Sequence, residues 1–165
     1  MLIEPTEDDE VGFVDFSNEI DGSGGDELKQ PAGGSRMPAS AETVAKRMHF
    51  VKQQGAQVFK YAVKKMEETS RNLLIRNNLK VSDIAALIPH QANRRIITAA
   101  AERLGIGCDR VSINIQRYGN TTAATIPLAM RDAVDAGMVK KGDLVLFAAV
   151  GAGYTVGTNL WRWEI

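Results

Sequence analysis

The chain of 165 residues is long enough for one domain with a sizeable buried core. Apolar residues make up 44% and charged residues 24%, and 20 basic side chains balance 20 acidic ones. This zero formal charge argues against a general nucleic-acid-binding surface and against a polybasic membrane surface, so neither nucleic acid nor membrane is an expected partner.

The cysteine, the histidines and the apolar runs exclude further classes. A single cysteine, Cys108, cannot form an intrachain disulfide, and a chain with only two histidines is not expected to hold a metal. The longest apolar run, residues 144–153, has ten residues, whereas a bilayer span needs about 20. The N-terminus lacks the basic start and long apolar core of a signal peptide, which predicts a cytoplasmic protein.

The first half of the chain predicts a strand, a loop and a helical region. Residues 11–17 are rich in β-formers, and residues 1–4 are a candidate stub of another strand. Residues 21–36 contain five glycines and predict a loop, whose composition favours a plain connection over an active-site flap. Residues 41–78 have helical periodicity with one apolar stripe, which is expected to be core, and Gly55 is a candidate break.

From residue 82 onward, predicted strands and helices alternate. The strands are expected at 84–88, 111–115, 144–150 and 154–163, and the helices at 92–104 and 122–136. We expect Gly105 and Gly137 to end the helices, Thr121 or Thr122 to cap the second one, and Gly157 to form a bulge. Parallel strands joined by helices and closed by a hairpin predict a single α/β domain over residues 1–165.

Two polar clusters follow predicted strands of this sheet. His90 lies in the segment 89–93 after one strand, and Asn120 lies in the segment 118–122 after the next. If the strands are neighbours, both side chains converge in one crevice at the carboxyl edge of the sheet. A neutral imidazole near a helix N-terminus and an amide could then donate two hydrogen bonds to one developing enolate or oxyanion. The alternative is a structural histidine and a Gly-Asn turn, and the spacing alone favours neither.

The remaining candidates have weaker local signals. Gly151, Ala152 and Gly153 are followed by a strand and do not form a dinucleotide fingerprint; they predict either a turn whose backbone N–H faces the site or a plain hairpin turn. Cys108 lies in a helix-to-strand connection on the opposite side, and we do not expect it to be a nucleophile. The arginines of the 92–104 helix are either solvated surface or the rim of a site for an acidic or phosphorylated partner: Arg94, Arg95 and Arg103.

Two of these segments carry a resemblance to a known family. Residues 88–97, Ile-Pro-His-Gln-Ala-Asn-Arg-Arg-Ile-Ile, closely resemble the histidine motif of 3-oxoacyl-[acyl-carrier-protein] synthase III, a condensing enzyme of the thiolase superfamily. Residues 118–127 look like its asparagine motif, and segments 21–25, 55–60 and 142–146 match in order and spacing. The resemblance covers only the C-terminal half of the family pattern. It implies a mixed five-stranded sheet with helices packed on it, which is half of a five-layer αβαβα sandwich.

The resemblance implies a chemical role for the residues of both motifs. In the family, a cysteine of the N-terminal half takes an acyl group from acyl-CoA, and malonyl-carrier protein then loses CO2 and attacks it. His90 and Asn120 match the two donors that hold the malonyl thioester carbonyl. The turn at Gly151, Ala152 and Gly153 looks like the one whose backbone forms part of the acyl oxyanion hole. No cofactor is implied, because thioesters of CoA and phosphopantetheine are the substrates of fatty acid or related polyketide biosynthesis.

The resemblance also implies partner surfaces. The docking segment for acyl carrier protein comprises Gln91, Ala92, Asn93, Arg94 and Arg95, to which Lys60 adds, and Arg95 is the expected phosphate or acid contact. Ala56 and Phe59 match the substrate channel. Ala152 and Val156 stand where many members have glycine and tryptophan, which puts the local pocket shape in doubt rather than the mechanism.

The implied partners include the N-terminal half of the fold and, in the full enzyme, a second copy in a homodimer. The half-sandwich predicts an exposed apolar face where its twin would pack. The chain is then either part of a full enzyme or one subunit of a split condensing enzyme. A non-catalytic binding or assembly module is the alternative, because the chain has no plausible nucleophile. The starter acyl group is not determined by these residues.

Overall fold

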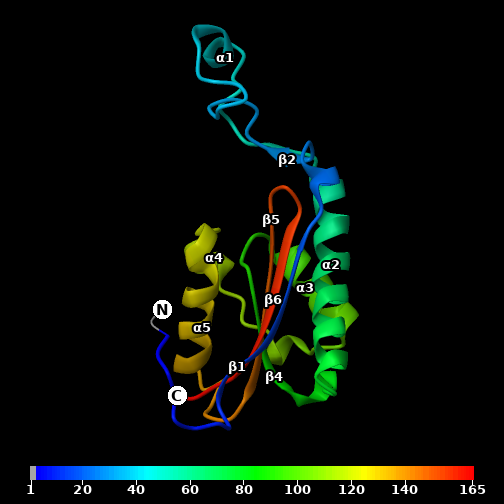
Figure 1. The fold of residues 1–165 in the computed structure, drawn as a ribbon, viewed down its shortest axis with the longest axis vertical. Helices are drawn as coiled ribbons and strands as arrows, with labels where there is room; N and C mark the ends of the chain where they lie inside the picture. The colour runs from blue at the N-terminus through cyan, green and yellow to red at the C-terminus, as the bar shows by residue number, and fades with distance from the viewer. Residues whose placement is uncertain (1–2) are drawn as a thin grey trace.

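The computed structural model describes residues 3–165 as one mixed sheet with helices on both faces (Figure 1). The sheet strands are β1 (Gly12–Ile20), β4 (Ile84–Pro89), β5 (Leu144–Gly151) and β6 (Thr155–Arg162). Their order is β1-β6-β5-β4; β4 and β5 are parallel, and the other two pairs are antiparallel. The predicted α/β class and mixed sheet are therefore confirmed.

The predicted strand at 111–115 is wrong. Only Val111 pairs with the sheet, through one parallel bridge to Leu87, and the chain then turns into the short helix α4 (Ile115–Tyr118). Polar groups of this segment bond elsewhere: the Ser112 hydroxyl donates to the Ala129 carbonyl oxygen, and the Asn114 N–H donates to the Gln91 side chain. Side-chain hydrogen bonds thus replace a strand ladder, and the sheet has four full strands with a single bridge at the fifth position.

Helices α2 (Gly55–Arg76) and α3 (Arg94–Leu104) cover one face of the sheet. The apolar stripe of α2 is core as predicted, and its buried members pack with side chains of α3 and of strands β4, β5 and β6. Gly105 ends α3 in the left-handed conformation, with φ 83°, as expected for a glycine helix stop. Close packing of this face fixes the start of α3, which directly follows the histidine segment.

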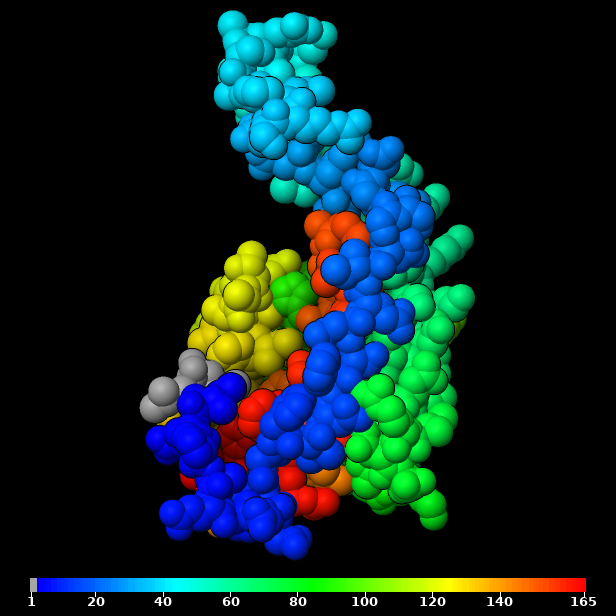
Figure 2. All heavy atoms as spheres, viewed as in Figure 1, coloured from blue at the N-terminus to red at the C-terminus, as the bar shows by residue number. Residues whose placement is uncertain are grey.

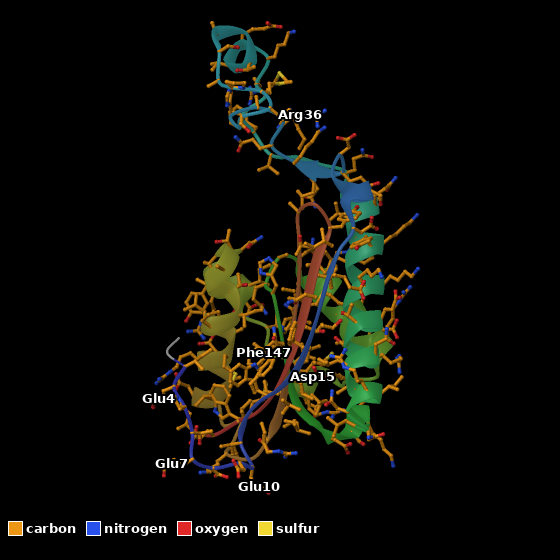
Figure 3. All side chains as sticks on the ribbon, in the orientation of Figure 1. Glu4, Glu7, Glu10, Asp15, Arg36 and Phe147 are labelled. Atoms are coloured by element: carbon orange, nitrogen blue, oxygen red, sulfur yellow. The ribbon has the colours of Figure 1, made fainter. Side chains whose placement is uncertain are left out.

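Helix α5 (Thr125–Asp135) covers the other face, where Ala129, Met130 and Ala133 pack against β4 and β5. The helix starts later than predicted: the 3-10 turn η4 (Thr122–Ala124) precedes it, and no side chain caps it. The expectation of a threonine cap is therefore wrong. On the same face lies an open depression of about 690 Å³, lined by Phe147 (labelled in Figure 3), Trp161 and Trp163 together with charged residues that include Lys141 and Glu164.

Residues 28–53 form an arm that extends away from the sheet (Figures 1 and 2). The arm contains β2 (Leu28–Lys29), which pairs with β3 (Lys52–Gln53), and the helix α1 (Ala41–Ala45). The predicted helical region 41–78 is thus two helices separated by an extended segment, and α2 begins at Gly55, the expected break. The glycine-rich segment 21–36 is largely loop, but it contains the 3-10 turn η1 (Gly22–Gly24) and β2.

Three local expectations have different outcomes. The strand predicted at 11–17 forms as β1, and its register with β6 shifts between Phe13 and Asp15. The bulge expected at Gly157 is wrong, since the ladder runs unbroken through it; a Cβ there would lie 3.0 Å from the Asn18 side-chain oxygen. Residues 1–4 are the candidate for a short further strand. Residues 1 and 2 lie outside the described residues, and residues 3 and 4 form no strand.

Two further 3-10 turns are η2 (Val81–Asp83), before β4, and η3 (Cys108–Arg110), after α3. No helix within residues 3–165 has the length and apolar character needed to cross a bilayer.

Candidate active site

His90 lies at the carboxyl end of β4. Its backbone N–H donates to the Ala148 carbonyl oxygen at 2.8 Å, so it continues the β4–β5 ladder by one residue. The half-buried ring has Nδ1 2.5 Å from the hydroxyl oxygen of Thr125, the first residue of α5. Burial lowers the pKa of His90 below its ordinary value, so the imidazole is neutral at pH 7. The sequence predicts this neutrality from a helix dipole, whereas the cause here is desolvation.

Asn120 lies on an exposed turn between α4 and η4. Gly119 before it has φ 69°, and the Asn120 Oδ1 accepts a hydrogen bond from the Thr122 backbone N–H at 3.0 Å. This bond uses the oxygen of the amide, and the NH2 group has no hydrogen-bond partner within residues 3–165. The Asn120 side chain is thus oriented through its acceptor and keeps its donors available.

A short hydrogen-bond network joins the two residues. The Thr125 hydroxyl oxygen lies 2.5 Å from His90 Nδ1 and 3.0 Å from the Thr122 carbonyl oxygen, and the Thr122 N–H bonds to Asn120. Thr122 has a positive φ of 53°, a conformation that a β-branched residue rarely adopts without support from its neighbours. The structure therefore brings His90 and Asn120 into one network at the same edge of the sheet.

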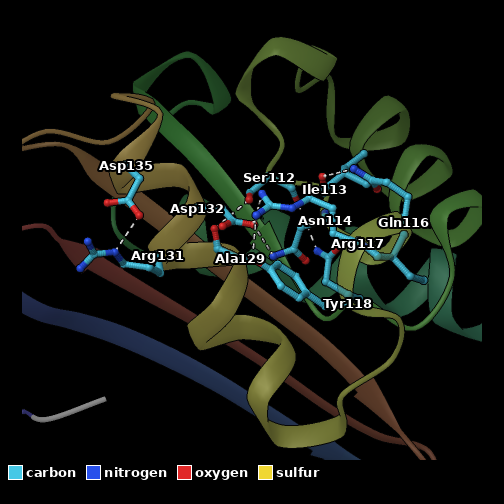
Figure 4. Close-up of polar contacts among 12 residues, drawn as sticks. Ser112, Ile113, Asn114, Gln116, Arg117, Tyr118, Ala129, Arg131, Asp132 and Asp135 are labelled. Atoms are coloured by element: carbon cyan, nitrogen blue, oxygen red, sulfur yellow. Dashed lines mark hydrogen bonds and ion pairs between the residues drawn. The ribbon is translucent and has the colours of Figure 1, made fainter.

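The segment before Asn120 is tied to helix α5 (Figure 4). Asp132 on α5 accepts a hydrogen bond from Asn114 Nδ2 at 2.8 Å and pairs with Arg117 at 3.4 Å. The Ser112 hydroxyl donates to the Ala129 carbonyl oxygen of the same helix at 2.8 Å. These contacts hold the chain that leads to Asn120 against the helix that begins with Thr125.

Gln91 has a different place from the one expected. Its side chain is fully buried, Nε2 donates to the Pro89 and Ser112 carbonyl oxygens, and Oε1 accepts from the Asn114 and Ile115 N–H groups. A buried side chain with four backbone partners cannot contact a docking protein, so the assignment of Gln91 to the carrier-protein surface is wrong. It holds the two motif-bearing segments together instead.

The other expected docking residues lie on the surface. Ala92, Asn93, Arg94, Arg95 and Lys60 are exposed. Asn93 caps α3, because its Oδ1 accepts from the Arg95 N–H at 2.9 Å. The Arg95 guanidinium lies 5.6 Å from the centroid of the partly buried Phe59 ring, and both border an open depression of about 440 Å³ between α2 and α3. Ala56 is exposed in the first turn of α2, and the substrate-channel role of Ala56 and Phe59 stays a prediction.

The segment at Gly151, Ala152 and Gly153 is the hairpin turn between β5 and β6. Gly151 and Ala152 are exposed, and Gly153 has φ 76°. The turn begins three residues after Ala148, the backbone partner of His90, so it lies at the same end of the sheet (Figure 1). Cys108 lies at the other end of β4, where its neighbour Arg110 donates to the Ile84 carbonyl oxygen. Within the described residues no group of histidine, cysteine, aspartate or glutamate side chains could hold a metal ion.

Sequence reasoning missed a cluster beside this turn. Tyr154 is buried and stacks on Tyr61, with ring centroids 3.8 Å apart, and its hydroxyl donates to the Glu27 carboxylate. Burial and this carboxylate raise the pKa of Tyr154 to about 12. Gly24 packs directly against the Tyr154 ring, where a Cβ would overlap it. The cluster connects the base of the arm to the turn; a tyrosine immediately after a glycine turn is its only local signal.

Solved structures with this arrangement define the class of protein. The chain superposes with a TM-score of 0.84 on beta-ketoacyl-[acyl carrier protein] synthase III from Thermus thermophilus, at 39% identity over 95% of this chain and 48% of that chain. On 3-oxoacyl-[acyl-carrier-protein] synthase III from Aquifex aeolicus VF5 the TM-score is 0.82, at 37% identity over 96% of this chain and 46% of that chain. The fold is thus the thiolase-like half-sandwich that the sequence predicts.

The family itself follows from the sequence match. Residues 74–163 match the family described as 3-oxoacyl-[acyl-carrier-protein (ACP)] synthase III C terminal, and the chain belongs to this family. A curated relative, beta-ketoacyl-[acyl-carrier-protein] synthase III of Solibacter usitatus (strain Ellin6076), is 67% identical over 99% of this chain. The match covers 50% of that relative, and the chain spans about half the length of the curated relatives it matches.

Proposed function

We propose that this chain is the C-terminal half of a 3-oxoacyl-[acyl-carrier-protein] synthase III and supplies the histidine and asparagine of its decarboxylative condensation. The network that joins His90 to Asn120 through Thr125 and Thr122 carries this proposal. It supports two neutral hydrogen-bond donors at one edge of the sheet, which is what a developing enolate oxygen requires. The nucleophilic cysteine belongs to the other half of the fold.

The reaction begins with the malonyl thioester. The bond between its carboxylate carbon and its C2 breaks, CO2 leaves, and the electron pair moves toward the thioester carbonyl oxygen. His90 and Asn120 each donate a hydrogen bond to that oxygen and so stabilise its negative charge. The lowered pKa of His90 supports a neutral ring that donates without giving up its proton, and the Asn120 amide does not titrate.

The electron pair released by decarboxylation then forms the new carbon–carbon bond. C2 attacks the acyl thioester on the cysteine of the other half, a carbon–carbon bond forms, and the cysteine thiolate leaves. The backbone at Gly151, Ala152 and Gly153 donates to the oxyanion of the tetrahedral intermediate. The chain needs no cofactor for these steps, because thioesters of CoA and phosphopantetheine are the substrates.

The partners follow from the surfaces around the site. Acyl carrier protein docks at the depression between α2 and α3, which Arg94 and Arg95 line, and the exposed Lys60, Ala92 and Asn93 add to this docking surface. Ala56 and Phe59 line the substrate channel. The other half of the sandwich packs on the face that α5 covers, where Phe147, Trp161 and Trp163 are apolar members of the lining of the open depression. The complete enzyme is a cytoplasmic homodimer of fatty acid or related polyketide biosynthesis.

One observation favours a second candidate, a non-catalytic binding or assembly module. The only cysteine, Cys108, is exposed and lies at the opposite end of β4 from His90, so the chain has no nucleophile in its own site. A module of this kind would bind carrier protein and its partner half without turnover.

The test is to co-express the chain with the N-terminal half of the Solibacter relative and to measure condensation of acyl-CoA with malonyl-carrier protein. His90→Ala and Asn120→Ala should each lower kcat by about 10²–10³, the loss typical of one such donor. His49→Ala, a histidine of the arm, is the matched control and should leave kcat unchanged. Unchanged condensation in both site variants would overturn the proposal, and tight assembly with no turnover in the parent would favour the module.

A further inference from the structure

We propose that Thr125 is a positioning residue that donates its hydroxyl hydrogen to Nδ1 of His90 and thereby keeps the ring proton on Nε2, where it can donate to the substrate carbonyl. This inference rests on the proposed function. Thr125 lies within the asparagine motif, but the sequence of the motif does not show that it contacts His90. Thr125 is fully buried, with 1% exposure, so its hydroxyl does not bond to bulk water.

The hydroxyl has one hydrogen and two neighbouring acceptors. Its oxygen lies 2.5 Å from His90 Nδ1 and 3.0 Å from the Thr122 carbonyl oxygen. A neutral imidazole also has one N–H, on either nitrogen. If the hydroxyl donates to Thr122, Nδ1 must hold the ring proton, and Nε2 then presents a lone pair that repels a carbonyl oxygen. If the hydroxyl donates to Nδ1, Nε2 holds the proton and becomes the required donor.

The surrounding hydrogen bonds permit the second arrangement, and the proposed donation from Nε2 to the substrate requires it. The Thr122 carbonyl oxygen already accepts the backbone N–H of Thr125, because η4 runs directly into α5. His90 Nδ1 has only the Thr125 hydroxyl as a partner within residues 3–165. Nδ1 is paired with the hydroxyl in either arrangement, as donor in the first and as acceptor in the second, and the Thr122 carbonyl oxygen keeps the Thr125 N–H when the hydroxyl turns to His90. What differs is Nε2, which can donate to a substrate oxygen only when the hydroxyl donates its hydrogen to Nδ1 of His90.

The backbone holds Thr125 in place for this task. It is the first residue of α5, and its branched side chain has few rotamers available in a helix. Helix α5 is bound through Asp132 and Ala129 to the segment that leads to Asn120. Thr122, the second neighbour of the hydroxyl, also donates its N–H to Asn120. One buried hydroxyl is thus linked to both donors of the site.

The first test reads the ring proton directly and does not depend on catalysis. The chain contains two histidines, and each has a threonine partner: His90 with Thr125, and His49 with Thr43, at 2.9 Å. With ¹⁵N-labelled histidine at pH 8, we expect the His90 signals of a ring protonated at Nε2 with a hydrogen-bonded Nδ1. Thr125→Val should shift the Nδ1 signal of His90 alone, Thr43→Val should shift the signals of His49 alone, and Thr125→Ser should restore the His90 signals.

A ring protonated at Nδ1 in the parent chain would overturn the proposal, and this measurement needs no variant that might not fold. So would an Nδ1 signal that is identical in Thr125→Val, with the fold of the sheet domain confirmed by an unchanged circular dichroism spectrum. Both results concern the tautomer alone and leave the proposed condensation activity standing.

The second test is kinetic, in the assembly with the N-terminal half. Thr125→Val should lower kcat by about 10-fold to 100-fold with little change in KM for malonyl-carrier protein, by analogy with the loss of a partner that orients a metal-binding histidine. Thr125→Ser should recover kcat. If kcat falls in His90→Ala but not in Thr125→Val, the positioning role is wrong and the proposed function stands. If His90→Ala itself has no effect, the proposed function is wrong.

Discussion

The Gln91 side-chain oxygen accepts a hydrogen bond from the backbone N–H of Asn114 at 3.0 Å, and this contact joins the segment that carries His90 to the segment that carries Asn120. The same oxygen accepts the Ile115 N–H at 3.2 Å, and Nε2 donates to the Pro89 and Ser112 carbonyl oxygens at 2.8 and 3.1 Å. One buried amide thus satisfies four backbone groups that a complete fifth strand would have paired with the sheet.

Replacing this amide with an apolar side chain of similar size should destabilise the fold strongly. Gln91→Leu leaves two buried N–H groups and two carbonyl oxygens without this partner, and each unsatisfied group costs about 1–3 kcal/mol. We expect the free energy of unfolding to fall by about 3 kcal/mol or more, measured by urea denaturation. Gln116→Leu is the matched control, because Gln116 is exposed. Equal losses in the two variants would show that the Gln91 bonds contribute nothing specific.

Gly24 should tolerate no side chain, because its Cβ position is occupied by the Tyr154 ring. Gly24→Ala must displace Tyr154 from its stack on Tyr61, and overpacking of this kind typically costs about 1–3 kcal/mol. Thermal unfolding should report a lower Tm. Gly22→Ala, in the same 3-10 turn, has open space at its Cβ and no positive φ, so it should be nearly neutral. An unchanged Tm in Gly24→Ala would mean that Tyr154 can move away from Gly24 without loss of stability.

Arg95 should act on carrier-protein docking rather than on chemistry. In the assembled enzyme, Arg95→Glu should raise the apparent KM for malonyl-carrier protein by a factor of about five or more, since a rim charge contributes about 1 kcal/mol to association with an acidic partner. The difference from the parent should shrink as salt is added. Cysteine acylation from acyl-CoA should change much less. The control is Arg103→Glu, at the far end of the same helix.

An equal loss in both half-reactions of Arg95→Glu, with no salt dependence, would remove Arg95 from the docking surface. That result would fit a packing role, because the Arg95 guanidinium also lies over the Phe59 ring.

The ion pair of Asp15 and Arg76 should make stability depend on pH in the acid range. Arg76 donates to both carboxylate oxygens at 2.8 Å, and with Asn77 it lowers the pKa of Asp15 from 3.8 to about 2. A carboxyl with a lowered folded pKa stabilises the protein above pH 4, and this contribution is lost as the pH falls from about 4 to about 2. Asp15→Asn should flatten stability over this window, as measured by denaturation at several pH values. Glu10→Gln is the matched control, since this exposed acid (labelled in Figure 3) has no side-chain hydrogen bond or ion pair within residues 3–165, and it should leave the slope in place.

The local sequence pattern determined most of the elements and the candidate catalytic residues. The apolar stripe of α2, the unbroken apolar run of β5 and the glycine stop at Gly105 are short-range signals, because each depends on residues within a few turns or one strand. His90 and Asn120 could be named as candidates because each lies in a short polar motif after a predicted strand, although only the strand before His90 forms, and their catalytic role stays a proposal.

Only the tertiary structure decided which polar groups pair. The segment 111–115 alternates like a strand, but partners distant in sequence, Gln91 and Ala129, take its hydrogen bonds and leave one bridge at Val111. The His90–Thr125 contact joins residues 35 positions apart, so neither residue alone predicts it. Hydrophobic periodicity predicts which face of a helix or strand is buried. The hydrogen-bond partners of distant segments depend instead on how α5 packs against β4, and a local sequence pattern does not predict that packing.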